Sequence, residues 1–144
     1  MKIDDILSTK GREVVTATPD QTVIEAVRTL VEHDIGAVVV VDDDGVCGIL
    51  SERDVLHLTS TDPGSLGRTR VSDAMTKDVV LGSGSDPIAD VMDVMTENRI
   101  RHLPIVREGV LEGIVSIGDV VNALRREVES ENRHLKDYIQ GSAY

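Results

Sequence analysis

The stretch Gly48–Leu56 reads GILSERDVL, and residues Gly113–Val121 read GIVSIGDVV. In each, a glycine and a short aliphatic run typical of a buried strand lead into Ser-x-x-Asp, which is typical of a first helical turn. Sliding the sequence by 65 residues superimposes Val15–Leu58 on Val80–Ala123 without a gap and with nine identical positions. The chain therefore consists of two copies of one unit.

Each copy predicts a strand, a helix, two strands and a closing helix, because runs of Val and Ile alternate with apolar residues at helical spacing. The first copy is expected to place these at Glu13–Thr16, Thr22–His33, Ala37–Val41, Cys47–Leu50 and from Ser51 onward. The second is expected to place them at Asp78–Leu81, Pro87–Asn98, Leu103–Val106, Leu111–Val115 and from Ser116 onward. The order β-α-β-β-α, twice, predicts an α+β fold, an α/β-type sandwich.

The composition is that of a globular protein with an aliphatic core. Of the 144 residues, 40% are hydrophobic, yet there is no Trp or Phe. No apolar stretch approaches the roughly 20 residues that span a bilayer, and MKIDDILSTKGRE lacks the apolar run of a signal peptide. Cys47 is the single cysteine, which excludes an internal disulfide. We therefore expect a cytoplasmic protein that does not enter membranes.

The formal net charge of −11 argues against nucleic-acid binding, which depends on Lys and Arg neutralising phosphates. A phosphate-bearing ligand would have to be small and held by a local cluster of cations. The four histidines share no metal-ligand spacing, and no nucleophile elbow or Walker loop is present. We expect no metal site and no catalytic activity.

The two Ser-x-x-Asp stretches, together with RIRHLPIV at Arg99–Val106, resemble the signature of cystathionine-β-synthase-type (CBS) domains. The resemblance covers essentially the whole chain and implies a stand-alone pair packed through its sheets with pseudo-twofold symmetry. It places the domains at residues 1–60 and 71–126, with a linker at 61–70 and a C-terminal helical extension and tail at 127–144. It also implies a homodimer and clefts for adenosine-containing ligands: AMP, ADP or ATP first, then S-adenosylmethionine or NAD-type molecules.

The Ser and Asp of each motif suit such a ligand. Ser51 and Ser116 are expected at helix N-caps, where free N–H groups and the helix dipole favour phosphate. Asp54 and Asp119, three residues on, can accept two hydrogen bonds from a ribose diol. The alternative is that each pair is only a capping box, which a duplication would copy equally well.

The resemblance also implies two crossed clefts, in which the motif of one copy faces strands of the other. One cleft would use Ser51, Arg53, Asp54, Val80, Ile100, Arg101 and His102. The other would use Ser116, Asp119, Val15, Ile35, Gly36 and Ala37. Two guanidiniums and an imidazole equip the first for phosphate, whereas Gly36 and Gly118 stand in place of the arginines in the second. We therefore expect the first cleft to prefer nucleotides and the second to distinguish little between AMP and adenosine.

The function predicted from these features is a sensor that changes conformation on binding an adenine nucleotide and acts in trans on an unidentified protein effector. The alternative is a ligand-free dimeric interaction scaffold whose Ser-x-x-Asp motifs are only helix caps. The polar helix that follows residue 126 is open to two interpretations, a solvated extension or a helix that docks on a partner subunit.

Overall fold

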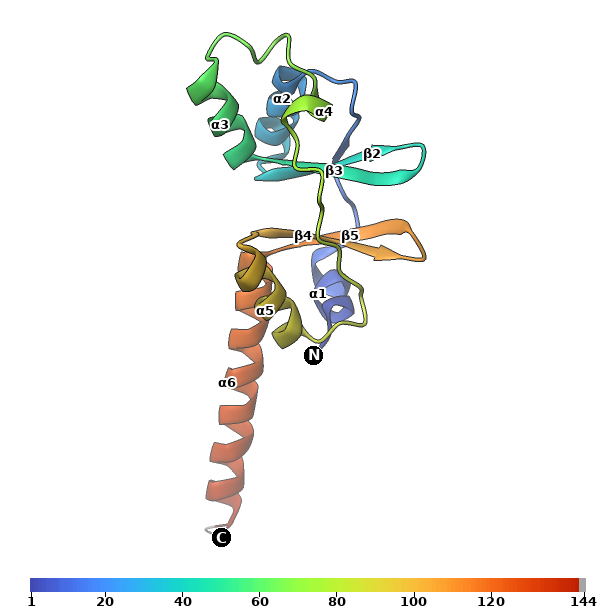
Figure 1. Cartoon of the computed structure of the whole chain (residues 1–144). Helices are drawn as coiled ribbons and strands as arrows, with labels where there is room; N and C mark the ends of the chain where they lie inside the picture. Colours follow the sequence, from blue (N-terminus) through green and yellow to red (C-terminus); the bar gives the residue numbers. More distant parts are fainter. Residues whose placement is uncertain (143–144) are drawn as a thin grey trace.

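Two small sheets face each other across the middle of the molecule, and helices cover their outer sides (Figure 1). The structure is a computed structural model that describes residues 1–142; residues 143 and 144 of the predicted tail lie outside the described residues. Its elements are α1 (Ile3–Lys10), β1 (Thr16–Ala17), α2 (Val23–His33), β2 (Ala37–Asp42), β3 (Gly45–Ser51), α3 (Glu52–Thr61), α4 (Val71–Ala74), α5 (Ile88–Asn98), β4 (His102–Arg107), β5 (Val110–Ser116) and α6 (Ile117–Ser142). The predicted α+β class is confirmed.

The internal repeat extends to details of the backbone. The hairpins β2–β3 and β4–β5 are antiparallel, and each carries an irregularity at the same place in the repeat, at Val40/Val41 and at Ile105/Val106. Helices α2 and α5 end on Asp34 and Arg99, both in the left-handed conformation (φ 51° and 54°). Since each pair is separated by the 65-residue period, the two copies share their strand register and their helix ends.

The first strand of the second copy is where the prediction is wrong. In the first copy, β1 runs parallel to β2, and Ala17 pairs with Val40. In the second copy the expected strand Asp78–Leu81 does not form, and the equivalent pairing shrinks to an isolated bridge between Gly82 and Ile105. Pro104 explains the loss, because it stands where the first copy has Val39 and has no N–H to donate to a neighbouring strand.

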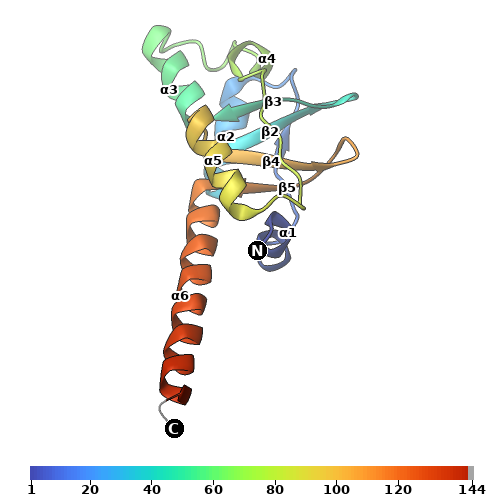
Figure 2. The same ribbon diagram turned by 60° about the horizontal axis from the view of Figure 1, so that its bottom comes forward.

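The lead-in helices are exchanged between the copies. Helix α1 lies under the sheet of the second copy (Figures 1 and 2), and its residues Ile3 and Leu7 belong to that copy's core. The short helix α4, which precedes the second copy, contributes Val71 to the core of the first copy. Each hydrophobic core is thus completed by a segment that lies next to the other copy in the sequence.

A glycine in each sheet makes this exchange possible. A Cβ on Gly113 of β5 would lie 2.8 Å from two methyl carbons of Leu7, and one on Gly48 of β3 would collide with Met75. Real Cβ atoms do not approach so closely, so only glycine lets these side chains lie flat on the strands. The glycine of the repeated motif is therefore explained by the packing of the opposite lead-in segment.

Charged side chains also join α1 to the second sheet. Arg12 forms ion pairs of 3.1 Å with both Asp4 and Glu112, and Arg107 reaches the same two carboxylates at 3.6 and 3.1 Å. Such partly exposed pairs contribute modestly one by one, and as a network they help to hold the helix against the second sheet.

Helix α6 continues well beyond the body of the molecule (Figure 2). Its first turns pack through Val120 and Ala123, whereas Leu135 and Tyr138 farther along are exposed. An extended C-terminal helix agrees with the sequence, and the choice between a solvated and a docking helix stays open. Among residues 1–142, no helix has the length and apolarity needed to cross a membrane.

Replacing Leu7 tests the exchanged packing. Leu7 is 1% exposed, so Leu7→Ala is expected to lower the free energy of unfolding by about 2–5 kcal/mol, through lost burial and a cavity against Gly113. Urea denaturation would measure the change, with Leu135→Ala (59% exposed) as the control that leaves stability nearly unchanged. Equal effects of the two substitutions would contradict a core role for α1.

Candidate functional site

Both Ser-x-x-Asp motifs cap helices. The Asp54 carboxylate accepts hydrogen bonds from the backbone N–H and the hydroxyl of Ser51 (2.9 and 3.1 Å), and the Asp54 N–H donates to the Ser51 hydroxyl at 3.4 Å. Ser116 and Asp119 form the same reciprocal pair, at 2.8 and 3.1 Å. The capping box is therefore present in both copies, and any ligand role would be added to it.

The two aspartates differ in their second partner. Asp54 accepts a hydrogen bond of 3.3 Å from the hydroxyl of Thr76. Asp119 forms a 2.6 Å ion pair with the Lys10 ammonium, which also donates to the carbonyl of Ile114 at 2.9 Å. Burial alone would raise the pKa of Asp119, but Lys10 and the N–H of Ser116 together hold it below its usual range. Asp119 is therefore a carboxylate at neutral pH.

A cleft of about 310 Å³ lies between the two copies. This volume is within the range of small-molecule sites. The structure brings together there five of the six residues expected for the second cleft: Val15, Ile35, Gly36, Ala37 and Ser116. The cleft is completed by Lys10, Glu13, Val14, Asp34, His102 and Ile114. Aliphatic side chains and polar groups from both copies thus converge on one space.

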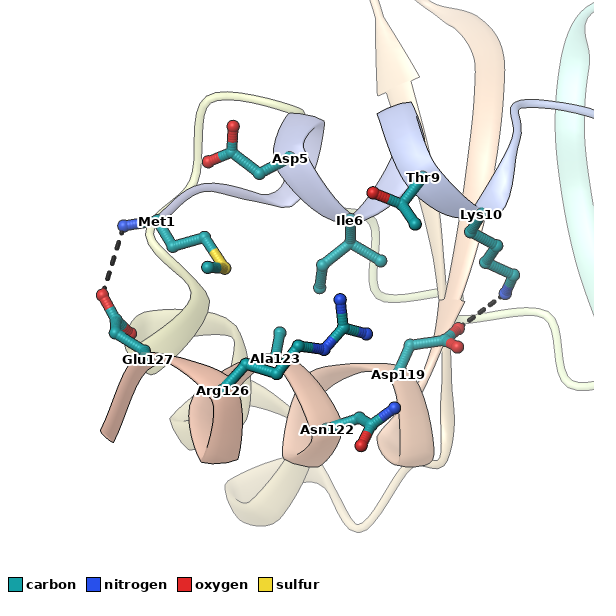
Figure 3. Close-up of a pocket in the computed structure, with 10 residues that line it drawn as sticks. All are labelled: Met1, Asp5, Ile6, Thr9, Lys10, Asp119, Asn122, Ala123, Arg126 and Glu127. Atoms are coloured by element: carbon teal, nitrogen blue, oxygen red, sulfur yellow. Dashed lines mark hydrogen bonds and ion pairs between the residues drawn. The ribbon is translucent and has the colours of Figure 1, made fainter. Parts of the chain in front are cut away.

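The sixth expected residue, Asp119, lines a neighbouring cavity of about 650 Å³ between α1 and α6 (Figure 3). Lys10 lines both cavities. The lysine and its partner Asp119 therefore form the boundary between the two spaces.

His102, which the sequence assigned to the first cleft, lines this cleft. A Cβ on Gly36 would lie 3.3 Å from two atoms of the imidazole, so the absence of a side chain at Gly36 leaves room for the ring. Burial lowers the pKa of His102, aided by the cations Lys10 and Arg101 and opposed by Glu52 and Asp119. The uncharged form of the ring is therefore favoured at neutral pH, and a role of His102 in binding phosphate remains a prediction.

The other residues of the first predicted cleft are spread over several environments. Val80 and Ile100 pack against the core of the second copy. The carbonyl of Arg101 accepts a 2.8 Å hydrogen bond from the N–H of Ile117, and residues Arg53 and Arg101 are exposed. A ligand site formed by these residues with Ser51 and Asp54 remains a prediction.

Lys10 is the residue that sequence analysis missed. It lies at the end of α1, which precedes the first copy in the sequence but packs against the core of the second copy. The sequence feature that could have revealed this placement of α1 is the lead-in repeat, DIL at Asp5–Leu7 and DAM at Asp73–Met75. The two lead-in copies are separated by three residues more than the 65-residue period of the repeat body. The 65-residue alignment therefore did not include them and gave no reason to place Lys10 near either Ser-x-x-Asp motif.

Comparison with known proteins identifies relatives across most of the chain. The family model for the CBS domain matches residues 3–60 and 71–126. A CBS domain-containing protein, CBSX3, mitochondrial, from Arabidopsis thaliana is 36% identical over 96% of this chain and 72% of its own length. Since that relative is mitochondrial, a cytoplasmic location for this chain remains a prediction.

Solved structures share the fold. The CBS-domain containing protein ATU1752 from Agrobacterium tumefaciens is 45% identical, with a TM-score of 0.82 over 85% of this chain and 98% of that one. The CBS domain pair of protein MJ0100, solved in complex with 5′-methylthioadenosine and S-adenosyl-L-methionine, is 22% identical, with a TM-score of 0.78 over 88% of this chain and 98% of that one.

The lowered pKa of His102 predicts a pH dependence of stability. The folded state binds a proton less readily than the unfolded chain, so stability present above about pH 6.5 is lost as the pH falls from there toward the folded-state pKa. Urea midpoints at pH 7.5, 6.5 and 5.5 should show a smaller loss for His102→Gln than for the unmodified chain. His134→Gln on the projecting part of α6 is the control. If the urea midpoints of all three proteins changed equally with pH, His102 would not be the group responsible.

Proposed function

The chain belongs to the CBS domain family as a pair of such domains, and we propose that it is a regulatory module that binds an adenosine-containing ligand between its two copies. The observation that carries the proposal is the cleft of about 310 Å³, where Val15, Ile35 and Ala37 of the first copy meet Ser116 of the second. Family relatives bind such ligands, as the MJ0100 complex illustrates.

The chemistry of the cleft suits a nucleoside. Val15 and Ile35 offer aliphatic walls for a purine, and backbone groups at Gly36 and Ala37 offer hydrogen bonds to its edge. Ser116 marks the first turn of α6, where the helix dipole favours negative charge. The Asp119 carboxylate beside it is an acceptor for a ribose diol. AMP, ADP and ATP are the ligands that we propose first.

The output of this module is a change of shape. A ligand in the cleft would contact the first copy through Val15 and Ile35 and the second through Ser116. If the ligand binds one arrangement of the two sheets more tightly than another, its binding shifts the population toward the arrangement with the higher affinity. We propose that a protein partner reads this arrangement in trans and that the chain itself is not catalytic.

A ligand-free scaffold is the second candidate, because the Ser and Asp of each motif already satisfy one another as a capping box. The two functions separate in a binding experiment. Asp119→Ala removes the cap in either case and is expected to lower the free energy of unfolding by about 0.5–2 kcal/mol. Only a ligand role predicts that the same change also affects nucleotide binding.

Millimolar AMP, ADP or ATP is expected to raise the melting temperature, because a ligand of the folded state stabilises it by RT ln(1 + [L]/Kd). In titration calorimetry, Asp119→Ala should reduce the number of sites per chain, whereas the control Asp137→Ala on the projecting part of α6 should not. No thermal shift with these nucleotides or with S-adenosylmethionine would refute the sensor and leave the scaffold.

We further propose a homodimer formed through the outer helices, where Val31 of α2 and Leu56 of α3 are 76% and 69% exposed. Light scattering is expected to give twice the 15.6 kDa of one chain. Val31→Glu and Leu56→Glu together should shift the mass to that of the monomer, because they place charge in an apolar interface. Val110→Glu, on the β4–β5 hairpin and 67% exposed, is the control. A monomeric unmodified chain at all concentrations would contradict the dimer.

A further inference from the structure

The boundary between the inter-copy cleft and the α1–α6 cavity is a single ion pair. Lys10 and Asp119 are joined at 2.6 Å, and their side chains are 38% and 27% exposed. The cleft on one side has the apolar walls that suit a nucleoside, and the α1–α6 cavity on the other side is larger and lined by charged groups. A ligand that reached Asp119 from the cleft would have to displace Lys10 or share the carboxylate with it.

The α1–α6 cavity contains a second cation. The guanidinium of Arg126 points from α6 toward Ile6, into the middle of the cavity (Figure 3). Within residues 1–142, the side chain of Arg126 makes no hydrogen bond or ion pair. The other carboxylates that line the cavity are engaged: Asp5 accepts from the N–H of Lys2 at 2.7 Å, and Glu127 accepts from the amino group of Met1 at 3.4 Å. Arg126 is thus available to an anion.

From these contacts we propose that the α1–α6 cavity is the phosphate subsite of the inter-copy cleft, and that Lys10 moves from Asp119 to the phosphate when a nucleotide binds. This inference rests on the proposed function, since it assumes a nucleoside in the cleft. The ribose hydroxyls take the place of the lysine on Asp119. Lys10 and Arg126 then hold the phosphate chain from α1 and from α6.

The exchange gives Lys10 a partner of higher negative charge than the carboxylate that it leaves. Lysine carries a compact charge on a flexible stem, so its ammonium can change partners without movement of the backbone. It gives up one carboxylate and gains a phosphate, to which charge-assisted hydrogen bonds are short and strong. Asp119 keeps its capping bond from Ser116 throughout. The ligand therefore replaces the ion pair and the Ile114 contact of Lys10 with contacts to the phosphate, and the Asp119 carboxylate is then held by neutral ribose hydroxyls and by its cap.

This assignment reverses an expectation from the sequence. The second cleft was expected to bind phosphate weakly, because Gly36 and Gly118 replace the arginines of the first. The structure supplies its cations from outside the repeat, from α1 and from the third turn of α6. We infer that this cleft discriminates in favour of nucleotides over adenosine.

Calorimetry with AMP and adenosine tests the inference, with Asp54→Ala present in every protein so that the other predicted cleft is silent. Lys10→Met is expected to raise the Kd of AMP about tenfold or more and to leave the Kd of adenosine unchanged or lower. Arg126→Met should act in the same direction, and more strongly on ADP than on AMP. Lys10→Arg, which keeps the charge, should retain the preference for AMP. Lys136→Met on the projecting part of α6 is the charge-matched control, and urea midpoints establish that each variant is folded.

The outcomes separate this inference from the proposed function. If the unmodified chain binds neither AMP nor adenosine, the proposed function fails and this inference fails with it. If that chain binds AMP and Asp54→Ala alone abolishes binding, the nucleotide site is in the other cleft and only this inference is wrong. Tighter binding of both ligands to Lys10→Met would show that Lys10 merely blocks Asp119. An unchanged ratio of the two Kd values would also overturn the phosphate subsite.

Discussion

The packing of Leu7 on Gly113, and of Met75 on Gly48, is the contact on which the rest of the structure depends. Each lead-in segment covers the sheet of the copy that is distant from it in sequence. Neither sheet could bury its outer face without the other copy's segment, because Ile3 and Leu7 fill one core and Val71 the other. The exchange therefore ties two β-α-β-β-α units into one cooperative body, since separating them would expose two cores at once.

The same exchange determines the chemistry of the cleft. Lys10 reaches Asp119 only because α1 is anchored on the second copy by Leu7 and by the ion pairs of Arg12. Directly after α1 the chain passes through Glu13, Val14 and Val15, which line the cleft on the side of the first copy. One continuous segment thus connects a structural helix, a cation and a cleft wall. A change in what Lys10 binds would act directly on the link between the two copies, which is where a sensor needs its ligand to act.

Much of the fold could be predicted because the repeat doubles every local signal. The helix predicted at Thr22–His33 is observed at Val23–His33, with Thr22 as its N-cap, and the strand runs were identified to within a few residues. Periodicity reports which side of an element is buried, but it does not report which copy buries it. It therefore placed α1 with its neighbour in sequence and gave no partner for Lys10. The strand predicted at Asp78–Leu81 failed for a different reason. The residue that prevents it, Pro104, lies on the neighbouring strand β4 and not in the predicted segment itself.

The sequence identified the Ser and Asp of each motif, but it could not predict which side chains the fold places beside them. Ser116 and Asp119 were expected as a cap or as a ligand site, and the structure shows why the two roles are compatible. One oxygen of Asp119, Oδ2, accepts both the capping N–H and the lysine ammonium. A carboxylate has about four lone-pair positions, so a hydroxyl can replace the lysine while the cap persists. Asp54 has the same cap but a neutral hydroxyl from Thr76 as its further partner. In a chain with a net charge of −11, a phosphate needs cations close by. The fold places one such cation, Lys10, within hydrogen-bond distance of Asp119, the carboxylate that would hold the ribose. The asymmetry between the two motifs therefore comes from the lead-in segments that the exchange places beside them, and not from the duplicated residues themselves.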